Sequence, residues 1–281
     1  MSTFDGDSTS NSGLDDLAGP DIVERLESSA AAERIDLGSG SITFRSWGSG
    51  PPLFLLHGAS GAWTHWVRNI EQLAMTRRVI VSDLPGFGDS DDLSDDSDVL
   101  VLVAHLTAAV EKITGTEQLD VVGFSFGGII AGLMSRQLGS RVQRLVLISA
   151  GGIGMSGRIA QPSDASPRGQ LVRFMFAEAA SADDTALRIH LDNITKARFK
   201  SGAIPSSTLL LDALPRISSD IYAIYGDRDA YGDGDTNTFF DRLRRGRSDI
   251  ECHTVLDAGH WIPYEQPTRL NALLSEILDR A

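Results

Sequence analysis

One serine in the sequence has neighbours that suit a nucleophile. Ser125 lies in the stretch Gly123-Phe124-Ser125-Phe126-Gly127, directly after the apolar run LDVV and directly before a helical pattern. This G-x-S-x-G spacing is typical of a strained turn from strand to helix, where bulky side chains two positions away would clash. The amides that begin the following helix favour negative charge near the serine. The pattern therefore predicts a nucleophile, and a packing turn with an incidental serine is the alternative.

A serine nucleophile needs a general base, and His260 is the strongest candidate. It comes after the last strand pattern and before the C-terminal helical pattern. This is the expected place when the chain order is serine, then acid, then base. The other histidines suit packing, loop or surface roles better, because they precede Ser125 or lie within strand and helix patterns: His57, His65, His105, His190 and His253.

Two aspartates compete for the role of the acid that orients the base. Asp227 and Asp229 both follow the strand pattern IYAIYG. Asp227 comes immediately after the glycine, where its carboxylate suits the turn itself. Asp229 lies further along the loop, nearer the expected pocket, and is therefore the predicted acid. Asp83 ends an earlier strand pattern, and we interpret it as a residue that organises its own loop.

Hydrolysis through a tetrahedral intermediate also needs donors for the oxyanion. The usual donors in this layout are the backbone N–H after the nucleophile and one from the loop after an earlier strand. Here these are the amides of Phe126 and Ala59. The pair His57-Gly58 makes the tight turn that directs the second amide, so His57 is expected to hydrogen-bond its own loop.

An alternation of strand and helix patterns must position these residues. It predicts an α/β protein with a mostly parallel central sheet, helices on both faces and right-handed crossovers. In such a sheet ligands bind beyond the carboxyl ends of the strands, so the candidate residues are expected to meet there. The strand patterns are ERIDLG, SITFRSWG, PPLFLLHG, RRVIVSDLPG, QLDVVGFS, VQRLVLISAGG, SDIYAIYGDRD and IECHTVLDAGH.

The alternation stops near residue 151 and resumes near residue 216. We therefore predict a core of residues 20–150 and 216–281, a helical cap of residues 151–215, and a disordered tail of residues 1–19. Within the cap, Leu187, Leu191 and Ile194 follow helical spacing and are expected to face inward. Arg198 continues this stripe. It either holds a substrate carboxylate or, as we favour, reaches the solvent at the end of the helix.

Composition excludes several classes of protein. The chain has 281 residues and a formal net charge of −13, which argues against nucleic acid or an anionic membrane surface as the main partner. Its single cysteine, Cys252, allows neither an intramolecular disulfide nor a cysteine metal cluster. No apolar stretch is long enough to span a membrane, and the N-terminus lacks the features of a secretion signal. We therefore expect a cytoplasmic protein, and the sequence leaves a homo-oligomer open.

Five motifs in order resemble the α/β-hydrolase family. They are LLHGASGAWTHW, VSDLPGFGDSD, GFSFGG, YGDRDA and DAGHWIPYEQP, and the resemblance runs from about residue 35 to the C-terminus outside the cap. Within the family the chain resembles the branch that contains meta-cleavage-product C–C hydrolases and small carboxylesterases. That branch commonly has asparagine where this chain has Phe124. The resemblance implies the α/β-hydrolase fold and a Ser-His-Asp triad.

Together these features predict a hydrolase of small, largely apolar carboxylic esters, with neither metal nor organic cofactor. Ser125 would attack the carbonyl, His260 would transfer the proton and Asp229 would hold the imidazole. The alternatives are a C–C hydrolase of vinylogous diketone acids, a cofactor-free oxygenase or perhydrolase, and a non-catalytic ligand receptor. The side chains expected to contact the substrate are Trp63, Phe124, Arg198 and Trp261.

Overall fold

The computed structural model describes residues 21–93, 98–155, 164–232 and 235–280, so the predicted tail of residues 1–19 lies outside the described residues. Eight strands form one sheet in the order β1-β2-β4-β3-β5-β6-β7-β8. Every predicted strand pattern forms one of them. Their bounds are β1 Ala31–Asp36, β2 Ser41–Trp47, β3 Pro52–Leu56, β4 Arg78–Ser82, β5 Leu119–Phe124, β6 Val142–Ile148, β7 Asp220–Gly226 and β8 Glu251–Val255.

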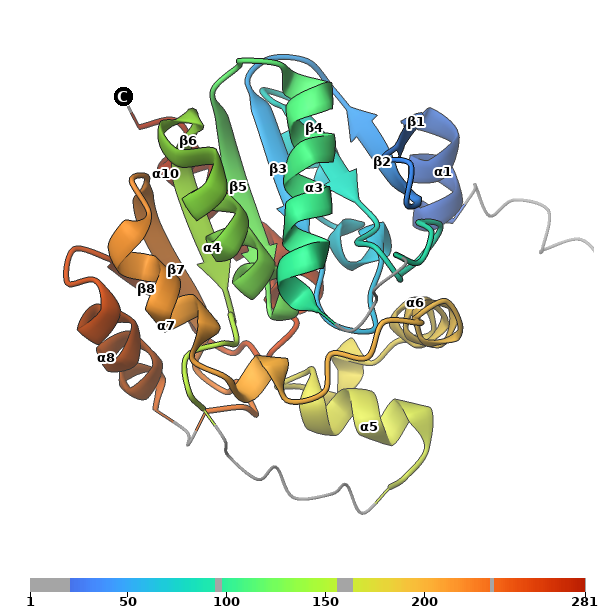
Figure 1. Ribbon diagram of the computed structural model, residues 1–281. Coiled ribbons are helices and arrows are strands. Elements are labelled where there is room, and N and C mark those ends of the chain that lie inside the picture. The colour runs from blue at the N-terminus through green and yellow to red at the C-terminus, as the bar shows by residue number, and fades with distance from the viewer. Residues whose placement is uncertain (1–20, 94–97, 156–163, 233–234, 281) are drawn as a thin grey trace, which may run out of the picture.

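The sheet is mostly parallel, which confirms the predicted fold class. Among the described strands, only the pairings of β1 with β2 and of β2 with β4 are antiparallel. Every residue of β3 and β5 is buried, as is usual for parallel strands that are covered on both faces. Figure 1 shows α3 and α4 on one face of the sheet and α10 on the other. Each face therefore packs its own apolar core against helices.

Ten α-helices are described alongside the sheet. Those of the first face, α3, α4, α7 and α8, share one apolar core with the sheet, while α1, α2, α9 and α10 share the other. The bounds are α1 Ile22–Ser29, α2 Ile70–Leu73, α3 Val99–Thr114, α4 Phe126–Leu138, α5 Pro167–Phe174, α6 Asp184–Thr195, α7 Leu209–Ala213, α8 Thr236–Gly246, α9 Ile262–Glu265 and α10 Pro267–Leu278. None of the described helices is long and apolar enough to cross a membrane.

The strand order reverses next to β3, and this reversal places the candidate site. From β3 the chain passes to β4 on one side, and then returns to β5 on the other. Leu56 at the end of β3 pairs with Gly123 near the end of β5, so both strands finish at the same edge. The loops that begin at His57 and Ser125 leave this edge together. Ligand crevices of open α/β sheets lie at such a reversal.

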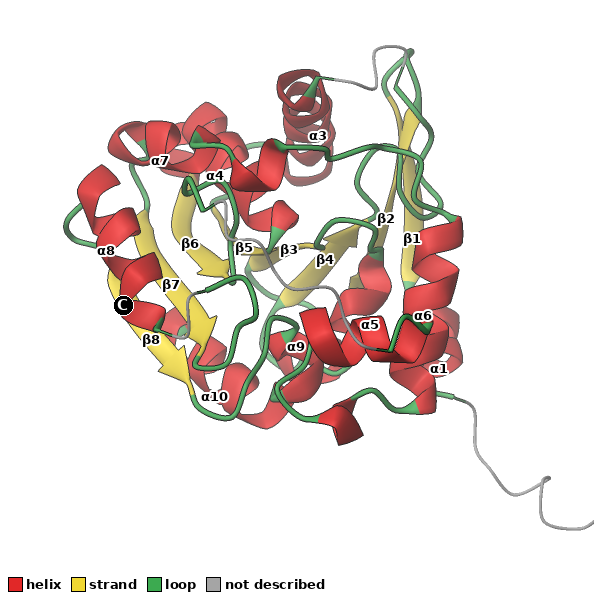
Figure 2. Cartoon of the chain, turned by 90° about the horizontal axis from the view of Figure 1, so that it is seen from below, coloured by secondary structure: helices red, strands yellow, loops and turns green. Residues whose placement is uncertain are grey.

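The segment between β6 and β7 contains α5, α6 and α7, and no strand among its described residues. Figures 1 and 2 show α5 and α6 beyond the carboxyl ends of the strands, where a cap is expected. α7 lies elsewhere: it packs against α4, where a side chain at Gly132 would meet Leu210 at 2.3 Å. The last turns of the predicted cap therefore pack on the core.

Asp183 joins α6 to the core. Its Oδ1 accepts a hydrogen bond from the Ala186 amide in the first turn of α6, which caps the helix. The same oxygen accepts from the Tyr264 hydroxyl at 2.6 Å, and Oδ2 accepts from Arg68 at 2.8 Å. One carboxylate therefore fixes both the start of α6 and its position over the strand ends.

Candidate active site

Ser125 lies in a sharp turn between β5 and α4. Its backbone has φ 54° and ψ −115°, a conformation that strains a residue with a side chain. A Cβ at Gly127 would lie 2.4 Å from the Leu56 carbonyl oxygen, and one at Gly123 would lie 2.4 Å from the Gly127 oxygen. Only glycine fits these two positions. The G-x-S-x-G spacing is therefore required by the turn that lifts the serine hydroxyl off the strand.

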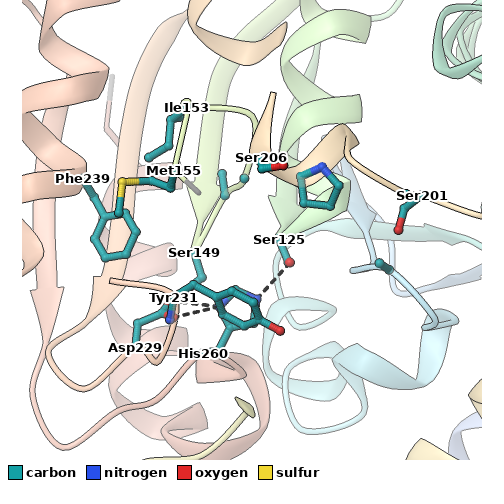
Figure 3. Close-up of a pocket in the computed structure, with 15 residues that line it drawn as sticks. Ser125, Ser149, Ile153, Met155, Ser201, Ser206, Asp229, Tyr231, Phe239 and His260 are labelled. Carbon is teal, nitrogen blue, oxygen red and sulfur yellow. Dashed lines mark hydrogen bonds and ion pairs between the residues drawn. The ribbon is translucent and has the colours of Figure 1, made fainter. Parts of the chain in front are cut away.

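The three side chains predicted to act together form one hydrogen-bonded chain (Figure 3). Ser125 Oγ lies 2.9 Å from His260 Nε2. His260 Nδ1 lies 2.9 and 3.1 Å from the two carboxylate oxygens of Asp229. With Nδ1 donating to the carboxylate, Nε2 is free to accept the serine proton. The aspartate and histidine side chains are both buried, which shields the pair from water.

The loops that carry the histidine and the aspartate are held by further hydrogen bonds. The Tyr231 amide donates to Asp229 Oδ1 at 3.0 Å, and the Tyr231 ring lies 4.4 Å from the His260 ring. The Gly259 amide donates to Glu265 Oε2 at 2.6 Å. The same carboxylate accepts from the Ala177 amide, which follows α5. The Glu265 carboxylate therefore links the residue before His260 to the segment that follows α5.

The two other carboxylates weighed from the sequence hold loops instead. Asp227 Oδ1 accepts from the Ala258 amide at 3.2 Å, so it ties its turn to the strand end that precedes His260. Asp83 accepts from the Trp63 amide at 2.8 Å and forms a buried ion pair with Arg45 at 3.1 Å. Neither is hydrogen-bonded to His260 among the described residues.

The backbone amides of Ala59 and Phe126 are the predicted donors of the oxyanion hole. Ala59 lines the cavity, and its N–H has no hydrogen-bond partner among the described residues. The Phe126 N–H, at the first position of α4, is likewise unpaired within the described part of the chain. Both amides are therefore available to bind a developing oxyanion, as an oxyanion hole requires.

A cavity of about 450 Å³ opens at the Ser125 hydroxyl. Figure 3 shows Ile153, Met155 and Phe239 together on one side of Ser125 and Ser201 on the other. Asp229, paired with His260, is its only carboxylate, and no lysine or arginine lines it among the described residues. The lining residues are Ala59, Ser125, Ser149, Ala150, Gly151, Ile153, Met155, Ser201, Gly202, Pro205, Ser206, Asp229, Tyr231, Phe239 and His260.

The four side chains expected to contact substrate do not line this cavity, which corrects that expectation. Phe124 and Trp261 are almost wholly buried and pack around the ring of His65. Trp63 packs against the Arg45 guanidinium in the loop core. Arg198 forms an ion pair with Asp92 at 2.7 Å and donates to backbone carbonyls. These four side chains therefore pack against or hydrogen-bond the loops around the site, and none of them borders the cavity.

Sequence reasoning missed the residues that form most of the cavity wall. Ser149 directly follows β6, has φ 45°, and its buried Oγ has no partner among the described residues. Its place at a strand end is a signal that could have identified it. Met155, Pro205 and Phe239 carry no such signal, because they come together only through the path of the chain between β6 and α8.

Two buried histidines hold the loop after β3. His57 and His65 are both nearly inaccessible to solvent. Burial lowers the pKa of the His57 imidazole. Burial, together with the neighbouring His57, holds the pKa of His65 well below its usual range. Both rings are therefore neutral at neutral pH, and each can serve as donor at one nitrogen and acceptor at the other.

We expect the free energy of unfolding to fall as the pH is lowered below about 6.5, the usual histidine pKa. The unfolded chain then binds protons on His57 and His65 that the folded chain does not. The free energy of unfolding is unaffected by these rings above that pH. It falls as the pH drops from there toward the lower pKa values of the folded state, and each ring lowers it by up to ~1.4 kcal/mol per pH unit. Urea unfolding at several pH values measures the slope. His65→Asn should flatten it, and an unchanged slope would contradict this account.

Comparison with known proteins identifies relatives over most of the chain. Residues 53–273 match the family described as "Alpha/beta hydrolase family". A 2-hydroxymuconate semialdehyde hydrolase from Pseudomonas sp. (strain CF600) is 29% identical over 83% of this chain and 89% of its own length. A putative aryl esterase from Burkholderia cenocepacia has a similar fold, with a TM-score of 0.76 at 21% identity over 88% of this chain and 97% of its own. A meta-cleavage product hydrolase reaches 0.72 at 23% identity over 89% and 98%.

Proposed function

Because this chain belongs to the α/β-hydrolase family, we propose that it is a serine esterase acting on small, neutral and largely apolar carboxylic esters. The observation that carries the proposal is the chain of hydrogen bonds from Ser125 through His260 to Asp229, all three of which line a cavity with no described lysine or arginine. The unpaired amides of Ala59 and Phe126 support the proposal, because acyl transfer needs donors for the oxyanion beside a serine and its base.

The proposed reaction proceeds in two balanced steps. Ser125 Oγ forms a bond to the ester carbon while its proton passes to His260 Nε2, and the carbonyl oxygen becomes an anion. The amides of Ala59 and Phe126 bind that anion, and Asp229 stabilises the imidazolium. The alcohol leaves with the proton from Nε2. Water then attacks the acyl-enzyme in the same way, which releases the carboxylic acid and restores the serine.

The cavity favours a neutral substrate over an acidic one. Among the described lining residues there is no cation that could pair with a substrate carboxylate, and the one lining carboxylate already pairs with His260. A carboxylate that enters such a site loses its hydration without gaining an ion pair, which is costly. Arg198, the cation considered for this role from the sequence, is paired with Asp92 outside the cavity.

Hydrolysis of a C–C bond is the second candidate. A relative 29% identical to this chain is named a 2-hydroxymuconate semialdehyde hydrolase, so its named substrate carries a carboxylate. The same serine, histidine and aspartate would serve in that reaction. The two candidates differ in the charge of the substrate that the cavity has to accept.

A carboxylic acid substrate and its methyl ester provide a direct test. We expect the wild-type enzyme to hydrolyse neutral p-nitrophenyl esters, and to prefer the methyl ester of a ring-fission keto acid over the free acid. Arg198→Ala should change neither kcat nor KM for either compound by more than about threefold, because surface substitutions are usually mild. A strong preference for the free acid that is lost in Arg198→Ala would contradict the proposal and favour the C–C hydrolase.

A further inference from the structure

We infer that His65 is a positioning residue of the oxyanion hole, which it orders by holding the amide of Gly58. The inference rests on the proposed function, in which the Ala59 amide binds the oxyanion and must therefore point in a fixed direction. His65 Nδ1 lies 3.3 Å from the Gly58 nitrogen, and the geometry makes the amide the donor. The nitrogen that accepts this bond is unprotonated, so the ring proton of the neutral imidazole lies on Nε2.

Gly58 is held on both sides. Its carbonyl oxygen accepts from His57 Nδ1 at 2.8 Å and from the Gly61 amide at 3.1 Å. His57 can donate there because its Nε2 accepts from the Leu84 amide at 2.9 Å. In a trans peptide the C=O and the next N–H point in opposite directions. Fixing the Gly58 carbonyl therefore aims the Ala59 N–H away from His57, toward the cavity that Ala59 lines.

The carbonyl alone does not fix this turn, because Gly58 has no side chain. A Cβ there would lie 3.0 Å from the Phe124 ring and 3.3 Å from Ser125 Cβ, so close packing favours glycine. Glycine rotates about φ more freely than other residues. The hydrogen bond to His65 removes this freedom, since it holds the peptide plane on the other side of the same Cα.

The His65 ring is itself fixed by its surroundings. It is 4% exposed, and it lies 4.9 Å from the Trp261 ring and 5.5 Å from the Phe124 ring. The Trp261 indole donates to the His65 carbonyl at 3.1 Å. A Cβ at Gly61 would come within 2.2 Å of the imidazole. Two side chains first expected to contact substrate therefore hold the ring that orients the loop.

The ring must stay neutral to accept this bond. The charged forms of His57, His190 and His260 all disfavour a proton on this ring. Burial and these histidines all lower the pKa of His65. His65 Nδ1 therefore keeps accepting the hydrogen bond from the Gly58 amide over the pH range in which a Ser-His pair is active.

A matched pair of variants separates the hydrogen bond from the packing. Asparagine can place Oδ1 where Nδ1 lies and accept the Gly58 N–H, whereas leucine places a methyl group there and is otherwise of similar size. We expect His65→Leu to lower kcat/KM for a neutral ester by about 10- to 100-fold, mostly in kcat, since outright loss of an oxyanion donor costs about 10²- to 10³-fold. His65→Asn should stay within about fivefold of wild type, because its acceptor remains.

Binding of a boronic acid, which forms a tetrahedral adduct with the serine, tests the oxyanion hole itself. Its Ki should rise in His65→Leu by the same factor as kcat/KM falls, and should change little in His65→Asn. Equal losses in the two variants, or a loss confined to KM, would overturn the inference and leave His65 a packing residue.

The ¹⁵N spectrum of wild-type histidines tests the inference without relying on a variant that folds. We expect His65 to be neutral with its proton on Nε2, and a proton on Nδ1 would overturn the inference. Fluorophosphonate labelling of wild type at Ser125 tests the proposed function separately. If labelling fails, that function falls, while the tautomer of His65 still decides whether the ring holds the Gly58 amide.

Discussion

Replacing Ser125 with alanine is expected to lower kcat for a neutral ester by about 10⁴- to 10⁶-fold, because the variant has no oxygen to form the acyl-enzyme. Removal of the Oγ atom leaves the hydrogen bond from the Ser125 amide to the Ile148 carbonyl at 2.9 Å in place. The two glycines that make room for the turn are also unchanged. The fold should therefore persist, and the variant should show a Tm close to that of wild type.

A second serine in the same cavity makes the experiment sharper. Ser149 also follows a strand, has a positive φ and is buried, but no histidine is hydrogen-bonded to its hydroxyl among the described residues. Fluorophosphonate should therefore label wild type and Ser149→Ala, and should not label Ser125→Ala. A loss of activity below tenfold in Ser125→Ala, or labelling that is lost only in Ser149→Ala, would move the nucleophile away from Ser125.

The sequence predicts the turn around Ser125 well because local physics requires its residues. A strand must end, the backbone must turn through a positive φ, and a helix must begin, so glycine, serine and glycine occupy fixed places. The choice between Asp227 and Asp229 also follows from the chain, since the residue next to the glycine completes the turn. Chain order then leaves His253 and His260 for the base, and the strand pattern around His253 favours His260. These inferences need only neighbours in sequence and the topology of a parallel sheet.

The cap shows where such reasoning fails. Leu187, Leu191 and Ile194 were expected to face inward, but Leu191 and Ile194 are 42% and 45% exposed. The buried face of α6 instead carries Ala186, Ile189 and Asn193. Asn193 accepts from Thr64 Oγ at 2.9 Å, a polar contact that apolar spacing cannot indicate.

The favoured expectation for Arg198, a side chain that reaches the solvent, agrees with its half-exposed ion pair, but the helical spacing used to place it does not apply. The helical stripe was extended to it from Leu191, but α6 ends at Thr195 and the backbone then turns. The amide of Arg198 donates to the Gly86 carbonyl at 2.8 Å, and its guanidinium pairs with Asp92. Helical spacing has no meaning beyond the end of the helix. The loop against which the segment after α6 packs is determined by tertiary contacts, and the local sequence does not encode them.

Replacing Asp229 with asparagine is expected to lower kcat by about 10²- to 10⁴-fold, with KM much less affected. The carboxylate accepts the proton on His260 Nδ1 at 2.9 Å. An amide group can donate to Nδ1 instead, which stabilises the tautomer whose proton is on Nε2. That tautomer cannot accept the proton of Ser125, and the imidazolium of the transition state loses its counter-charge.

Asp227→Asn is the matched control for this substitution, because it makes the same chemical change two residues away in the same loop. Asp227 accepts from the Ala258 amide at 3.2 Å and forms no hydrogen bond with His260 in the described part of the chain. Its replacement should leave kcat within about tenfold of wild type, while the loss of a charged acceptor should lower the free energy of unfolding by roughly 1 to 3 kcal/mol. Steady-state kinetics and urea unfolding of both variants measure the two effects. If Asp227→Asn lost more activity than Asp229→Asn, the acid would be the first aspartate of the loop, and the geometry described for His260 would not be that of the working enzyme.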